Sequence, residues 1–181
     1  LTFLGFPPTA AASNSLFAAL SNAIASTISY SKQKRIEYPL GLKLGLLSIP
    51  GTVLGAIIST DVAPDMFKIL FGFVLIASAA YIFLRKKIET KEKRISKQMM
   101  IFAIGASFFA GVISSFFGIG GGIIFVPLMV VGMGMAMKKA APTSQMILLF
   151  ASLSGVIVHS LLGHPDFLQA GWLAIGSFIG G

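Results

Sequence analysis

The stretch FFGIGGGIIFVP, residues 116–127, decides the fold of this chain. Within an otherwise apolar run it holds four glycines in five residues: Gly118, Gly120, Gly121 and Gly122. In hydrocarbon, an opened backbone is tolerated only where protein buries it or where it lines a water-filled cavity. Helices broken at membrane depth are typical of the binding sites of secondary transporters. The stretch therefore predicts a glycine-broken helix at a binding site inside a membrane.

The composition of the whole chain agrees with a membrane protein. Of its 181 residues, 55% are hydrophobic and 11% are charged, and the mean hydropathy is +0.89. A soluble domain carries about 25% charged residues. Here the charges are excluded from apolar blocks that are long enough to cross a bilayer. We therefore predict an all-α, polytopic integral membrane protein that contacts the lipid bilayer of the cell membrane.

The residue types that are absent or rare exclude several kinds of chemistry. The chain has no cysteine and only two histidines, so disulfides and thiolate metal sites are excluded. No acidic residue falls inside an apolar block, and an integral membrane enzyme would need a nucleophile–base pair or metal ligands. We therefore predict neither an enzyme, nor a metal site, nor a cofactor.

The basic residues give the orientation of the chain in the membrane. The net charge is +8, and seven of the 14 Lys and Arg residues lie in 85–97. Without aromatic or motif context this run does not indicate nucleic-acid binding. Between apolar helices, a basic run indicates a cytoplasmic loop. The basic residues in 32–35 agree with this. One predicted helix separates them from the acidic turn at 61–65, and another separates that turn from the basic run at 85–97, so we expect the acidic turn outside.

Apolar blocks between charged breaks predict the helices. Single helices are expected at about 10–31, 39–60, 66–84 and 140–162, and another begins near residue 167. The long apolar stretch 99–137 is broken at the glycines. If Lys138 and Lys139 are cytoplasmic, this stretch enters and leaves on one side as a hairpin of two arms of roughly 16 residues, about 24 Å each. The alternative is one long kinked helix with both lysines outside.

An internal repeat links the two halves of the chain. A shift of 129 residues aligns 5–51 with 134–180 without a gap, with ten identities in 47 positions. The loop at 32–37 is basic, whereas its counterpart at 161–166 has no Lys or Arg, so the repeats are expected to be inverted. We divide the chain into the C-terminal part of repeat 1 (1–84), a basic loop (85–98) and the N-terminal part of repeat 2 (99–181). The counterparts of the remaining segments are expected beyond both ends, so the chain is expected to be a fragment.

Several motifs together resemble the sulfite exporter TauE/SafE family. They are SSFFGIGGGIIFVPL (114–128), KAAPTS (139–144), AGWLAIGSFIG (170–180) and, in the first half, GTVLGA (51–56). The resemblance covers nearly the whole chain, and it implies a multi-pass transporter of small anions, typically sulfite, sulfonates or related organosulfur acids. One departure is that the first-half glycine motif is missing, which leaves half of the implied binding cleft outside this sequence.

The glycine cluster is the first candidate for anion binding. A helix N-terminus offers unpaired N–H groups and a favourable dipole to an anion. Gly118, Gly120, Gly121 and Gly122 would let a substrate approach the bare backbone. Pro127 lacks an N–H and would free a carbonyl in the following arm. The alternative is that the glycines only allow close helix packing.

Two polar groups near helix starts are the second candidate. They are Asn14 and Ser15 in the first half and Thr143, Ser144 and Gln145 in the second. They would either cap their own helices or direct two sets of donors at one midplane site. Ser114 and Ser115 would line the same cleft, or else bond to carbonyls of their own helix.

The remaining polar and small residues have simpler interpretations. His159 and His164 lie near the external end of a helix, where an interfacial hydrogen bond is favoured over proton coupling. Gly51 and Gly55 form a G-x-x-x-G pair, which indicates helix packing.

The sequence as a whole favours a transporter of small anions that works by alternating access. A non-transporting membrane scaffold or assembly protein, or an anion channel, remains an alternative. A homo-oligomer is compatible with the sequence.

Overall fold

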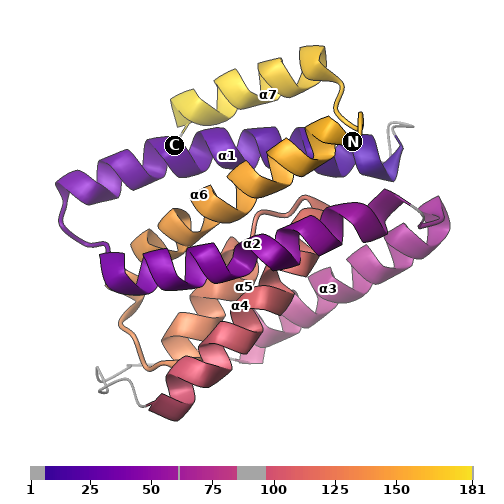
Figure 1. Cartoon of the computed structure of the whole chain (residues 1–181). Helices are drawn as coiled ribbons and strands as arrows, with labels where there is room; N and C mark the ends of the chain where they lie inside the picture. Colours follow the sequence, from indigo (N-terminus) through magenta and orange to yellow (C-terminus); the bar gives the residue numbers. More distant parts are fainter. Residues whose placement is uncertain (1–6, 61, 85–96, 181) are drawn as a thin grey trace.

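The computed structural model describes residues 7–60, 62–84 and 97–180, and the regular structure in these ranges is entirely helical (Figure 1). The elements are α1 (Pro8–Lys32), α2 (Tyr38–Thr60), α3 (Pro64–Leu84), α4 (Lys97–Phe117), α5 (Gly122–Pro127), the π-helix η2 (Leu128–Gly132), α6 (Met137–Leu161) and α7 (Phe167–Gly180). The predicted all-α class is therefore confirmed. The basic loop expected at 85–98 lies almost entirely outside the described residues.

Three of the described helices are long and apolar enough to cross a bilayer. They are α2 (Tyr38–Thr60), α4 from Gln98 to Phe117, and α6 (Met137–Leu161). Their lengths of 23, 20 and 25 residues suit a hydrocarbon core of about 30 Å. The helix α7 is also apolar but has 14 residues.

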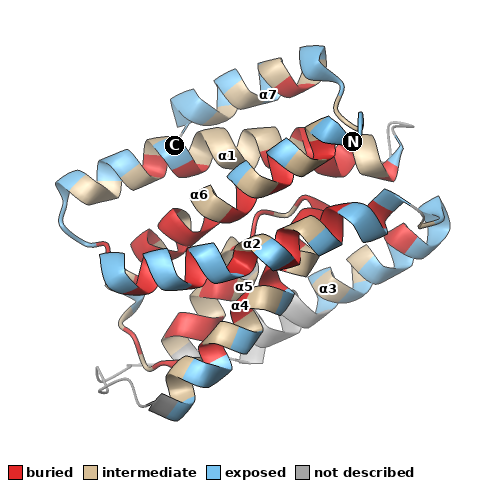
Figure 2. Cartoon of the chain, in the orientation of Figure 1, coloured by how far each residue is buried: buried red, intermediate tan, exposed pale blue. Residues whose placement is uncertain are grey.

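Helix α6 is the centre of the arrangement. It packs against both α1 and α2, while α7 lies along α1 and α4 packs against α2 (Figure 1). Burial is concentrated on α6, on one face of α2, on the first half of α1 and on the chain between α4 and α5 (Figure 2). The outward faces expose large apolar side chains, among them Ile69, Phe73, Trp172 and Ile179. An apolar exterior of this kind is suited to lipid rather than to water.

Glycines bring the backbones of α2 and α4 into direct contact. A Cβ added to Gly51 or Gly55 would overlap a backbone carbonyl oxygen of α4, and one added to Gly111 would overlap the carbonyl oxygen of Ser48. Small residues permit such close approach between membrane helices. The structure thus confirms that Gly51 and Gly55 serve helix packing.

The helix is interrupted at residues 118–121, and the chain then runs back along α4. Gly132, at the end of η2, would place an added Cβ 3.8 Å from the ring of Phe102 near the start of α4. The two arms are unequal, however: α4 has 21 residues, and α5 and η2 have six and five. The expectation of two arms of about 16 residues was wrong. Gly105 and Gly111 stay helical in α4, whereas the returning arm changes to a π-helix after Pro127 and ends before Gly134, whose φ is +66°.

The contact between α2 and α4 can be tested at one glycine. We expect Gly55→Ala to destabilise the protein by about 1–3 kcal/mol, because the added methyl overpacks against the Val112 carbonyl. The matched control is Gly72→Ala in α3, where nothing lies within 4 Å of an added Cβ, so stability should hold or rise slightly. Thermal unfolding of the purified protein in detergent measures both. Equal melting temperatures for the two variants would contradict the packing.

Candidate functional site

The interrupted segment, residues 118–121, is buried between α1 and α6. Gly118 and Gly120 have φ of +67° and +61°, a conformation that glycine adopts without steric cost. A Cβ on Gly118 would overlap the backbone of Ala12 in α1. One on Gly120 would lie 3.0 Å from Leu148 of α6 and 3.1 Å from Ala19 of α1. We call residues 118–121 the glycine apex.

Aromatic side chains close a further side of the apex. Phe116 and Phe117, the last residues of α4, are buried against α3. The ring of Phe67 lies 5.6 Å from that of Phe116 and 5.3 Å from that of Phe117, and Phe71 lies 5.7 Å from Phe117, all measured between ring centroids. Aromatic contacts of this kind contribute beyond simple area burial, so they fix the end of α4 directly before the apex.

Hydrogen bonds within the apex use part of its opened backbone. The N–H of Gly121 donates to Ser114 Oγ at 2.9 Å, and the Gly121 carbonyl accepts from the N–H of Phe125 at 2.8 Å. Ser114 was expected either to line a cleft or to bond to its own helix, and it instead accepts a bond from the apex. In this conformation the Gly121 N–H is therefore engaged by protein.

Gly122 differs from its neighbours because it has open space beside it. Among the described residues no atom lies within 4 Å of a Cβ added there, whereas at Gly121 an added Cβ would overlap the Phe125 ring. Gly122 is the first residue of α5, and η2 follows directly after Pro127. A methyl group at Gly122 would therefore meet none of the described side chains.

The two predicted polar groups lie at opposite ends of α1 and α6, so the structure does not bring them together. Thr143 Oγ1 accepts the N–H of Glu37 at 3.0 Å, and Asn14 Oδ1 accepts the N–H of Asp166 at 3.1 Å. Neither side chain caps its own helix, so the capping interpretation was wrong. Each side chain instead ties one helix to the loop at the end of the other.

The end near Thr143 also carries an ion pair. Lys139 Nζ lies 3.0 Å from Glu37 Oε1, with both side chains half-exposed. Exposed pairs of this kind contribute little to stability, about 0–1 kcal/mol. The hydrogen bond to Thr143 and the ion pair therefore act together on one loop residue.

The remaining predicted polar residues have mixed surroundings. Ser144 donates to the Ala141 carbonyl of its own helix at 2.7 Å, and Ser15 is half-buried. Gln145 Oε1 and Asn14 Nδ2 are buried without a hydrogen-bond partner among the described residues. Unpaired buried polar atoms are unusual and call for an explanation, such as a ligand or an ordered water.

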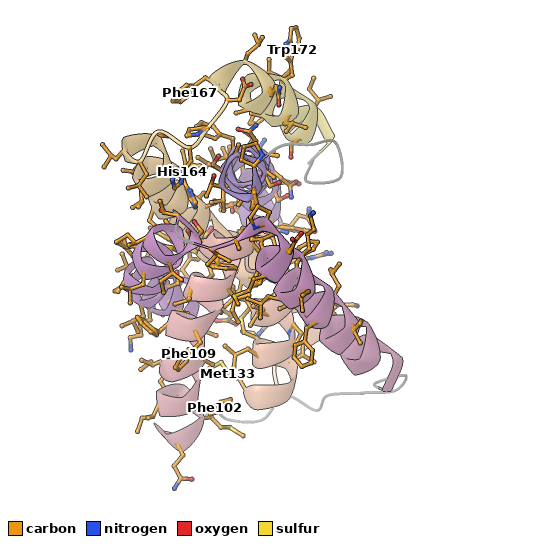
Figure 3. All side chains as sticks on the ribbon, turned by 90° about the vertical axis from the view of Figure 1, so that its right-hand side faces the viewer. Phe102, Phe109, Met133, His164, Phe167 and Trp172 are labelled. Atoms are coloured by element: carbon orange, nitrogen blue, oxygen red, sulfur yellow. The ribbon has the colours of Figure 1, made fainter. Side chains whose placement is uncertain are left out.

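The two histidines bond to each other. His159, which is fully buried, has Nδ1 at 2.8 Å from Nδ1 of His164. Its Nε2 lies 3.2 Å from the Ser115 carbonyl oxygen. Burial lowers the pKa of His164, which lies in the loop before α7 (Figure 3). The predicted hydrogen bond is thus present, and it joins the two histidines to each other.

Sequence reasoning missed a set of polar contacts between α2, α4 and α6. Thr52 Oγ1 and Ser154 Oγ are 2.5 Å apart, and Ser107 Oγ donates to the Leu44 carbonyl at 2.6 Å. Single Ser and Thr residues in apolar helices form no motif. The available signal was the spacing of Ser48 and Thr52, which are one helical turn apart beside the glycines of the G-x-x-x-G pair.

Long apolar helices around an interrupted segment that protein buries are the arrangement typical of membrane transport proteins. The whole chain, residues 1–181, matches the family model described as sulfite exporter TauE/SafE. The chain therefore belongs to the sulfite exporter TauE/SafE family, as its motifs predicted. This family is one of membrane transporters.

Three relatives carry the description "probable membrane transporter protein". YunE of Bacillus subtilis is 28% identical over 195 residues, covering 99% of this chain and 71% of its own length. A protein of Methanocaldococcus jannaschii is 28% identical over 148 residues, covering 81% of this chain and 54% of its own length. ORF9 of Sinorhizobium sp. is 24% identical over 176 residues, covering 97% and 67%. The chain thus spans between about half and seven tenths of these relatives, and no solved structure matches it.

The bond between Thr143 and the Glu37 N–H can be tested with a substitution of the same shape. We expect Thr143→Val to lower the free energy of unfolding by about 1–3 kcal/mol, because a partly buried N–H loses its acceptor. Thr143→Ser keeps the hydroxyl and should recover most of this loss. Unfolding in detergent measures both variants. A valine variant as stable as the parent would show that the bond contributes nothing.

Proposed function

We propose that this chain forms the core of a multi-pass carrier in the cell membrane for small anions. Sulfite, sulfonates and related organosulfur acids are the proposed substrates, by analogy with the family description. The observation that carries the proposal is the glycine apex, buried between α1 and α6 in a chain of a transporter family. Such interrupted backbone is the usual site of substrate binding in secondary transporters.

Two inverted repeats are part of the proposal, and the helix bounds support them. A shift of 129 residues carries the start of α1 onto the start of α6, the end of α1 onto the end of α6, and the start of α2 onto the start of α7. The same shift exchanges the two hydrogen bonds between halves: Asn14 with Asp166 becomes Thr143 with Glu37. Thus α2 packs against α6, and its counterpart α7 packs against α1.

The helix ends add further support for the repeats. Lys34 has φ of +54° and its repeat counterpart Gly163 has φ of +73°. The N–H of Lys34 donates to the Ser31 carbonyl at 3.0 Å, and that of Gly163 donates to the Ser160 carbonyl at 3.2 Å. Both α1 and α6 therefore end in the same left-handed turn. A lysine in this conformation is unusual, so the matching turn at Gly163 is further support for the repeat.

The broken hairpin is proposed to enter and leave the membrane from the cytoplasmic side. Its support is the return of η2 along α4, as judged from Gly132 beside Phe102, together with the basic residues that flank 99–137 on both sides. Irregular backbone at membrane depth has to be buried by protein or line a cavity. Here α1, α6 and the aromatic residues of α3 and α4 surround it.

The proposed substrate site is the apex with the space beside it. Gly118, Gly120, Gly121 and Gly122 would present backbone N–H groups to the anion, and the Gly121 N–H would exchange its bond to Ser114 for one to substrate. Pro127 belongs to the proposed site through its place in the arm that follows, since it has no N–H to donate. Hydrogen bonds to an anion are strengthened by its charge. In this proposal the anion is therefore bound by backbone N–H groups and not by a positively charged side chain.

The polar groups at the two ends are proposed to control access. Asn14 and Ser15 lie at one end of the helix pair, and Thr143, Ser144 and Gln145 lie at the other. In alternating access, one end opens while the other stays closed. The two hydrogen bonds between the repeats are suited to this, because breaking one leaves the other intact.

The transport proposal is tested by Gly122→Leu in proteoliposomes loaded with sulfite. We expect the initial sulfite flux to fall about tenfold or more, the effect of losing about 1.4 kcal/mol of interaction, because the leucine fills the space beside the apex. The control is Gly72→Leu, at a site equally free of neighbours. Gly121→Leu is less informative because it collides with the buried Phe125 ring.

The outcomes separate the parts of this proposal. Unchanged flux in Gly122→Leu would count against the apex as the binding site. A parent protein that moves no sulfite or sulfonate would reject the transport function for these anions and favour a scaffold. Flux that does not saturate with concentration would indicate a channel.

A further inference from the structure

The geometry of the histidine pair requires a single hydrogen between the two rings. The Nδ1 atoms of His159 and His164 are 2.8 Å apart and the ring centroids 5.1 Å apart. At that distance one nitrogen donates and the other accepts. Two N–H groups cannot face each other there, and two bare nitrogens would repel.

The contact of His159 with α4 decides which nitrogen donates. His159 Nε2 lies 3.2 Å from the Ser115 carbonyl oxygen and 3.5 Å from Ser115 Oγ. A carbonyl oxygen only accepts, so Nε2 carries the hydrogen. The Nδ1 atom of a neutral His159 is therefore bare, and it accepts from Nδ1–H of His164.

This tautomer leaves room for one added proton. Nε2 of His164 is the bare nitrogen of the neutral pair, and His164 is the less buried of the two rings. A proton added there keeps the bond between the Nδ1 atoms and gives its donor a positive charge, which strengthens it. A second proton would place hydrogens on both Nδ1 atoms and break the bond. The pair thus binds one proton without rearrangement.

Few charged groups surround the pair. Helices α1, α2 and α4 carry one charged residue each, Lys32, Lys43 and Lys97, and α6 carries Lys138 and Lys139; all of these lie toward the opposite end of the bundle. Helix α3 carries Asp65 and Lys68 next to Phe67, which packs against Phe116 beside Ser115, and these two exposed side chains pair with each other at 3.5 Å. Helices α5, η2 and α7 carry no charged residue. The loop that holds His164 carries Asp166, whose Oδ1 accepts the N–H of Leu168 and Gln169 at the start of α7. Because burial lowers the pKa of His164 below its ordinary value of 6.5, the pair is neutral at pH 7 and takes up its proton in more acidic solution.

The pair is connected to the glycine apex through the last turn of α4. Ser115, which holds His159, is adjacent to Ser114, which accepts the Gly121 N–H. One turn before His159, a Cβ on Gly155 would lie 3.5 Å from Ser115 Oγ. A change in the charge or position of His159 would therefore first alter the contacts of Ser115 and Ser114, where α4 meets the apex.

We propose that His159 and His164 form a proton-binding site that the proton enters through His164. Its uptake controls the contact between His159 of α6 and Ser115 of α4, and through Ser115 the packing of α6 at the apex. The inference has a consequence for transport, namely that anion movement is linked to the proton gradient, and this consequence rests on the proposed function. The proton site itself does not depend on that function.

The first experiment measures the proton site directly. Because the chain has two histidines, ¹⁵N-histidine labelling of the purified chain reports on this pair alone. We expect scalar coupling between the two Nδ1 nuclei across the hydrogen bond, and uptake of one proton by the pair in a single step below pH 6.5. His164→Asn should abolish the coupling. Two independent titrations near pH 6.5 without coupling would overturn the proposal.

The second experiment measures the link to transport. Proteoliposomes are loaded with methanesulfonate, whose charge does not change over the working pH range, and a pH gradient is imposed. We expect the flux of the parent protein to follow the gradient, and His164→Asn to remove this response. The control is Asp65→Asn, which neutralises an exposed carboxylate on α3 and should keep the response.

The two experiments fail in distinguishable ways. A His164→Asn variant whose flux follows the gradient as the parent does would overturn the coupling. Absence of methanesulfonate and sulfite flux in the parent would instead reject the proposed function, and the NMR titration would still decide whether the proton site exists.

Discussion

The contact between the backbone of Gly118 and the backbone of Ala12 is the constraint on which the arrangement depends. It exists because Gly118 has no Cβ and adopts a left-handed conformation. The contact seats the interrupted segment against α1, and α1 in turn packs on α6 and α7. Within a membrane the opened backbone has no water to satisfy it. Burial at Ala12 and the bond from Gly121 to Ser114 together make the interruption tolerable.

Most of the fold could be predicted from the sequence because the charged breaks and the apolar blocks are clearly separated. The predicted start of the second helix lies within one residue of the observed α2, and its end coincides. The position of the interruption was also predictable, since four clustered glycines are rarely compatible with a continuous helix. The lengths of the two arms were not. They depend on how a π-helix after Pro127 fits against α4, which no local pattern encodes.

The candidate site was predictable in composition but not in connectivity. Asn14 and Thr143 were recognised as important polar positions, yet their partners are backbone groups more than 100 residues away in the chain. A backbone N–H carries no sequence signal, so such bonds can only be read from the fold. The bond between His159 and His164 was easier to predict, because the two residues are five positions apart in the chain. The orientation of the His159 ring, however, depends on Ser115 in another helix.

The ion pair between Lys139 and Glu37 makes the two ends of the helix pair unequal. Residue 10, which precedes Lys139 by the repeat distance of 129, is an alanine, so the end held by Asn14 lacks the corresponding cation. Half-exposed charges are screened by dissolved ions over about 8–10 Å at physiological ionic strength. In the proposed alternating-access carrier, added salt would therefore weaken the closure at Lys139 and Glu37 and spare the one at Asn14, so the two proposed closures would respond differently to ionic strength.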